Sequence, residues 1–94
     1  MNAYQQVAED VRLAFVAERQ NAELRGASAD RLHHLDLAIN EAEDARDALR
    51  DCSSKGSAIA TVTALQDRAQ GGDEKDDAAA DSAGGAILLA MAKL

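Results

Sequence analysis

Residues 25–32 read RGASADRL and mark the end of one predicted helix and the start of the next. Gly26 suits the left-handed conformation that closes many helix C-termini, and Ser28 is a favourable N-cap residue for the helix that follows. Asp30 places negative charge in the first turn of the second helix, where the helix dipole favours it. Because so short a link makes the flanking helices antiparallel neighbours, this stretch predicts a helical hairpin.

Two helices of similar length are predicted around this link, over residues 3–25 and 29–51. The first has an apolar stripe at spacings of three and four, formed by Tyr4, Val7, Ala8, Val11, Ala14, Phe15 and Ala22. The second has a seam with heptad-like spacing, formed by Leu32, Leu35, Ile39, Ala42 and Leu49. Arg46 stands within this seam, between its last two apolar positions. The two stripes are expected to pack on each other.

The position of the link also predicts the register of the hairpin. A turn near residue 27 places Phe15 close to Ile39 and Val11 close to Ala42. Each of these pairs would lie in the contact between the two helices.

The same register brings Arg46 close to Glu9 or Asp10. One interpretation is a partly buried ion pair that fixes the alignment of the helices without necessarily adding stability. The other is that the long arginine stem covers the seam while its charged group stays in water. The second interpretation is the more ordinary one, and it is the one that we expect.

The rest of the chain predicts a third helix, an acidic linker and a short apolar end. The third helix, residues 57–70, has one apolar face, formed by Ala58, Val62, Leu65 and Ala69. Residues 71–85 contain no large apolar residue and carry five acidic residues against one lysine, a composition typical of a flexible linker. Residues 86–94 regain apolar character. The predicted fold is all-α: a hairpin plus third helix over residues 1–70, the linker, and a short C-terminal docking helix.

Composition limits the size of the core and the classes of partner. The chain has 94 residues, of which 2% are aromatic, and a formal net charge of −7. Such a small core is often completed by oligomerisation. The negative charge disfavours binding to nucleic acid or to an anionic membrane. A secretory signal is not apparent, and the apolar end is shorter than the roughly 20 residues that cross a bilayer, so we expect a cytoplasmic or virion protein.

The residues that usually carry chemistry are few and poorly spaced. Adjacent His33 and His34 would point about 100° apart on a helix, and Asp30 with His34 makes only two metal ligands. The acidic run of residues 73–82 lacks the oxygen spacing of a calcium loop. Cys52 is a lone cysteine with no candidate base near it. We therefore predict no catalytic residue, no metal site, no cofactor and no enzymatic activity.

Apolar residues outside the hairpin seam predict contacts with other proteins. Leu13 and Leu24 lie on the far side of the first helix, and Leu37 lies off the seam of the second. The third helix is too short to cover both surfaces. Residues 86–94 are expected to dock in a groove of a neighbouring subunit or another protein, although they could instead fold back as a fourth helix. The predicted interface residues are Leu13, Leu24, Leu37, Ile87, Leu88, Met91 and Leu94.

These patterns favour a non-enzymatic structural or connecting subunit of a larger bacterial or bacteriophage assembly, such as a virion component or a secretion filament. The expected partners are other protein subunits, including copies of the same chain. The alternative is a small acidic regulator, such as a secretion chaperone, an antitoxin-like inhibitor or a nucleic-acid mimic, that binds one protein partner reversibly. A regulator of this kind would bind one-to-one and would weaken with salt.

Overall fold

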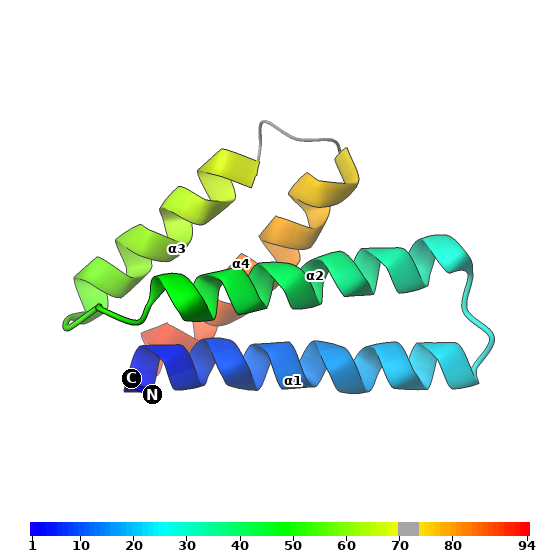
Figure 1. Cartoon of the computed structure of the whole chain (residues 1–94), viewed down its shortest axis with the longest axis horizontal. Helices are drawn as coiled ribbons and strands as arrows, with labels where there is room; N and C mark the ends of the chain where they lie inside the picture. Colours follow the sequence, from blue (N-terminus) through cyan, green and yellow to red (C-terminus); the bar gives the residue numbers. More distant parts are fainter. Residues whose placement is uncertain (70–73) are drawn as a thin grey trace.

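A computed structural model of the chain describes the backbone of residues 1–69 and 74–94 and the side chains of residues 1–67 and 82–94. Within these ranges it is all-α and has no strand, as the sequence predicts. The helices are α1 (Ala3–Leu24), α2 (Ala29–Ala48), α3 (Lys55–Ala69) and α4 (Glu74–Ala92) (Figure 1).

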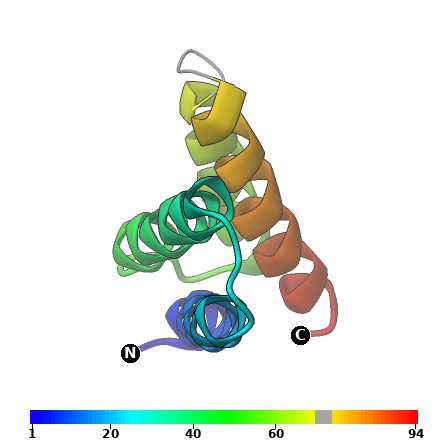
Figure 2. The same ribbon diagram turned by 90° about the vertical axis from the view of Figure 1, so that its right-hand side faces the viewer.

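The helices form two pairs that cross each other. Helices α1 and α2 lie side by side as the predicted antiparallel hairpin, and α3 and α4 form a second, inclined pair (Figure 1). Viewed along the hairpin, α4 descends past α2 towards α1, and α3 lies beside the upper part of α4 (Figure 2). Helix α4 therefore packs against each of the other three helices, whereas α3 packs mainly on α4.

Local capping explains where the hairpin helices begin and end. Gly26 has a φ of 76°, and the Ser28 hydroxyl accepts a hydrogen bond from the backbone N–H of Arg31 at 3.2 Å, as the sequence of the link predicts. At the other end, Asn2 and Gln5 form a capping box at the start of α1. The Asn2 side-chain amide also donates to the carbonyl oxygens of Leu49 (2.9 Å) and Arg50 (3.0 Å). One residue thus caps the start of α1 and the end of α2.

Alanine dominates the core, in which four helices meet. Its buried residues are Ala8, Val11, Ala42, Ala45, Leu49, Ala58, Val62, Ala83, Ile87 and Met91. The largest fully buried side chains are Leu35, Leu49, Ile87, Met91 and Val62. Two of these five belong to α4, so the C-terminal helix is part of the core.

The C-terminal segment is the main difference from the sequence-based expectation. Ile87 and Met91 are fully buried within their own chain, which corresponds to the alternative of a fourth helix that folds back. Helix α4 begins at Glu74, so it includes most of the range 71–85 that was predicted to be a linker; residues 71–73 lie outside the described part. The segment contains alanines that favour a helix, but also aspartates and two glycines that do not, so its helix depends on the groove that holds its apolar end.

A glycine lets α3 and α4 approach closely. A Cβ atom added at Gly84 would lie 2.5 Å from Nε2 and 2.8 Å from Cγ of Gln66 in α3, whereas one added at Gly85 would meet nothing within 4 Å. The two adjacent glycines therefore differ: a side chain at position 84 would force the Gln66 side chain to move, whereas one at position 85 has open space.

Burial of Ile87 predicts a large difference between two substitutions on the same helix. Ile87→Ala should lower the free energy of unfolding by about 2–5 kcal/mol, because it leaves a cavity in the core. Leu89→Ala, at a position that is 71% exposed, should change it by about 0.5 kcal/mol or less. Urea unfolding followed by circular dichroism measures both. Equal effects would show that α4 is not held in this groove.

The two glycines give a second matched pair. Gly85→Ala should stabilise the protein by roughly 0.5–1 kcal/mol, because alanine favours a helix interior. Gly84→Ala should leave the protein about 1–3 kcal/mol less stable than Gly85→Ala, because its methyl group crowds Gln66. In a Gln66→Ala background, the difference in the free energy of unfolding between the two alanine variants should decrease. A difference that persists there would show that the Gln66 side chain is not the source of the steric clash.

Candidate protein-interaction surface

The outer face of α1 exposes large apolar side chains. Leu13 is 50% exposed and Leu24 is 86% exposed, and their spacing places them on the same side of the helix. Exposed Ala17 and half-buried Val16 lie between them on that side. We call these four residues the α1 face. Helix α3 packs mainly on α4 and does not cover it, in line with the expectation that the third helix is too short.

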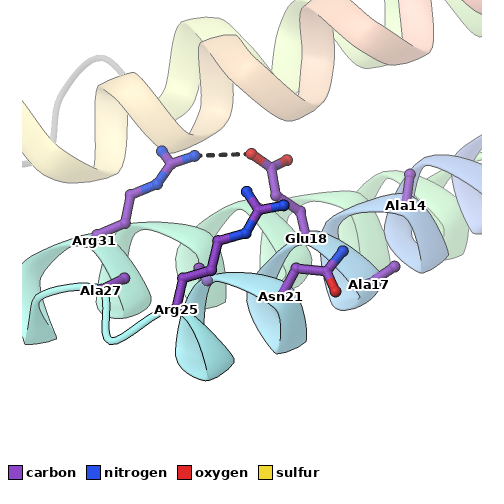
Figure 3. A pocket seen from close by; sticks show the side chains of 8 residues that line it. Ala14, Ala17, Glu18, Asn21, Arg25, Ala27 and Arg31 are labelled. Carbon is purple, nitrogen blue, oxygen red and sulfur yellow. Dashed lines mark hydrogen bonds and ion pairs between the residues drawn. The ribbon is translucent and has the colours of Figure 1, made fainter.

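A hollow lies beside the α1 face, near the link between α1 and α2 (Figure 3). It is open and has a volume of about 600 Å³. Its lining residues are Ala14, Ala17, Glu18, Asn21, Ala22, Arg25, Ala27 and Arg31. The link end of the hairpin extends beyond α3 and α4 in Figure 1, so this part of the hairpin has no helix over it. Ala17 belongs to both surfaces, which makes them continuous.

Charged side chains rim the hollow. Nη2 of Arg31 lies 2.8 Å from Oε1 of Glu18, and this ion pair joins α2 to α1 across the hollow (Figure 3). The Arg25 side chain extends on the same side (Figure 3), and among the described residues it has no hydrogen bond or ion pair. Two guanidinium groups and one carboxylate therefore surround a floor of alanines.

Ion pairs between α1 and α2 set the register of the hairpin that carries this surface. Nη1 of Arg46 lies 2.7 Å from Oε2 of Glu9, and Arg12 contacts the other Glu9 oxygen. The Glu9 and Arg46 side chains are 15% and 25% exposed. Our expectation that the Arg46 charge would stay in water was therefore wrong, because Glu9 lies within reach. Further along, Nε of Arg19 lies 2.5 Å from Oδ1 of Asp36. These pairs match the predicted register to within one residue.

The electrostatic effect of this cluster is clearest at Glu9. The hydrogen bond from Arg46, followed by that from Arg12, holds the pKa of the Glu9 carboxyl below its ordinary value. The same hydrogen bond to Glu9 raises the pKa of Arg46. Both groups are thus ionised together over the ordinary pH range.

The predicted interface residues fall into distinct places. Leu13 and Leu24 form the α1 face, and Leu94 is also exposed at the end of the chain. Leu37 is half-buried on α2, and Leu88 is partly buried against the core. Ile87 and Met91 are covered by the chain itself. Exposed Leu89 and the hollow were not predicted. Alanines give no sequence signal for a hollow, because its position depends on where α4 diverges from the hairpin.

The residues considered as metal ligands or as a nucleophile do not form a site in the described ranges. No group of three or more histidine, cysteine, aspartate or glutamate residues could hold a metal ion in the described ranges. Sγ of Cys52 lies 3.5 Å from Oγ1 of Thr61 and 3.7 Å from Oγ of Ser57, so its nearest polar neighbours are hydroxyl groups rather than a base. Within the described residues, no helix has the length and apolar character needed to cross a membrane.

Comparison with models of known protein families, with curated proteins and with solved structures finds no match to this chain. The surface geometry and the sequence are therefore the grounds for a functional proposal.

The lowered pKa of Glu9 predicts an acid-dependent contribution to stability. Ionised Glu9 is favoured in the folded state, so its contribution is complete above the ordinary glutamate pKa of 4.5. It decreases as the pH falls through the lowered pKa of the folded state. Glu9→Gln should therefore destabilise the protein at neutral pH and have a much smaller effect in strong acid, as measured by urea unfolding.

Glu18→Gln provides the control for this experiment, because Glu18 pairs with Arg31 at a half-exposed position. Its effect at neutral pH should be smaller than that of Glu9→Gln. A Glu9→Gln penalty that does not depend on pH would contradict the proposed role of the carboxylate charge.

Proposed function

We propose that this protein is a non-enzymatic structural or connecting subunit of a larger bacterial or bacteriophage assembly and acts through helix packing. The observation that carries the proposal is the uncovered α1 face, with Leu13 and Leu24 exposed beside an alanine-floored hollow. Apolar surface of this kind is costly to leave in water, and it typically marks a contact with another protein. The bacterial or bacteriophage setting rests on composition alone: alanine is abundant and arginine exceeds lysine.

The position of α4 changes which surface makes the proposed contact. Ile87 and Met91 fill a groove of their own chain, so they are not available to a partner while this fold is intact. The α1 face then becomes the main candidate surface. Leu89 and Leu94 remain exposed on the C-terminal segment and offer a smaller second patch.

The alternative is a small acidic regulator that binds one protein partner reversibly. Exposed aspartates on α2 and in the turn after it favour this candidate, because they present negative charge without a covering helix. Such a contact would form one-to-one and would weaken steeply as salt is raised, since salt screens exposed charges.

Multi-angle light scattering across protein concentration and salt tests the proposal. The full chain should show a mass above that of the monomer that survives added salt, because apolar contacts at the α1 face are not screened. The double variant Leu13→Glu/Leu24→Glu should have the mass of the monomer, because charges at the α1 face disfavour the apolar contact. Ala60→Glu, at an exposed position of α3 outside both candidate patches, is the control for added negative charge and should leave the mass unchanged.

Circular dichroism shows whether the leucine variants keep their helices, as expected for exposed positions. Leucine variants that assemble like the unmodified chain would contradict the role of the α1 face. A chain that is monomeric throughout would contradict self-assembly and favour the regulator.

A further inference from the structure

The outward side of α2 carries aspartates and little apolar surface. Asp44 and Asp47 are exposed on the helix, and Asp51 is exposed in the turn that follows it. Exposed Ala48 and half-buried Leu37 lie among them at helical spacing. Asp44 and Ala48 point away from the α1 contact, because Arg46, which pairs with α1, lies on the opposite side of the helix. Asp47 lies at the edge of this side, and its Oδ1 is 3.5 Å from Nε of Arg46. We call these five residues the acidic α2 face.

The hollow and the acidic α2 face complement each other in charge. The hollow presents two guanidinium groups: that of Arg25, which has no ion pair among the described side chains, and that of Arg31, which pairs with Glu18. The acidic α2 face presents Asp44 and Asp51. Guanidinium and carboxylate groups form the strongest charge-assisted pairs available to side chains.

The two surfaces also match in side-chain size. The floor of the hollow is alanine, and the acidic α2 face has Ala48 at its centre with aspartates around it. Small side chains on both sides allow the helices to approach closely, which brings the charged groups at the rim within reach of each other. A helix that carried large apolar side chains would bury them in the hollow but would leave the arginines without partners.

We propose that the hollow binds the acidic α2 face of a second copy of this chain, so that copies add head to tail. This inference rests on the proposed function, which it deepens by naming the partner. The charge pairs of this contact should weaken as salt is raised, whereas the apolar contact at the α1 face should persist. The contact joins two different surfaces, so it generates a ring or an open filament rather than a closed two-fold dimer. A two-fold contact between two hollows would instead bring the arginines of both copies together, which like charges disfavour.

Two complementary variants test this contact in the full chain. The hollow variant carries Asn21→Glu with Arg25→Glu, which spares the α1 face, and the α2-face variant carries Asp44→Arg with Ala48→Arg. All four positions are exposed, so both variants should keep their helices by circular dichroism. Each variant alone should associate at least about tenfold more weakly than the unmodified chain, because like charges now meet.

Mixing the two variants provides the decisive measurement. The intact hollow of one variant meets the intact acidic α2 face of the other, and the introduced glutamates and arginines also have opposite charges. The mixture should therefore regain the association that each variant alone has lost, as seen by light scattering. Arg50→Glu is the charge control: it reverses an exposed arginine outside both surfaces and should leave association unchanged.

Three results would overturn the inference. If both variants assemble like the unmodified chain while the leucine variants of the α1 face do not, this contact is absent and the proposed function stands. If the mixture stays monomeric, the surfaces are not complementary. If the unmodified chain is monomeric at every concentration, both the inference and self-assembly fail. Should a double variant lose its helices, the single substitutions Arg25→Glu and Asp44→Arg replace it in the same mixture.

Discussion

Close packing between alanines is the constraint on which the rest of this structure depends. Ala8, Ala38, Ala42 and Ala45 are buried where the hairpin meets its neighbours. Small side chains let helices approach closely, but each contributes few apolar atoms to the core. The hairpin therefore gains much from the larger side chains of α4, Ile87 and Met91. Their burial explains why the C-terminal helix belongs to the fold.

An alanine contact holds helices together without choosing one register over the next, because methyl groups look alike along a helix. Polar groups supply that choice here. The pairs Glu9–Arg46 and Arg19–Asp36 can form together in only one alignment of α1 and α2. Such pairs do more for specificity than for stability, since removing charges from water is costly. The Glu18–Arg31 pair does not follow this register: it runs obliquely between the two helices, across the hollow near the link.

The sequence was most informative where the determinants are local. Gly26 and Ser28 predicted the link, and the link predicted both the antiparallel hairpin and its register. The sequence was less informative where the outcome depends on contacts between distant segments. Residues 86–94 have the same composition whether they dock on their own chain or on another, and only the groove decides between these. The extent of α4 was missed for this reason.

The candidate interaction surface also has one part that the sequence predicted and one part that it did not. Leu13 and Leu24 could be placed outside the seam from spacing alone, and both are exposed. The hollow beside them could not be predicted, because it is defined by the helix that is absent above it rather than by its own residues. Arg25 and Arg31 have ordinary positions in the sequence, and only the folded hairpin brings them to the same rim.

The double cap made by Asn2 affects how this protein comes apart. Helix ends usually fray, because their last carbonyl and N–H groups lack partners. In the hairpin, one end is closed by the covalent link and the other by the hydrogen bonds of Asn2 to the carbonyls of Leu49 and Arg50. Both ends of the hairpin are therefore held together. The backbone amides of α1 and α2 should exchange with solvent as one slow unit. Fraying should be greater in the second pair of helices, α3 and α4, than in the hairpin.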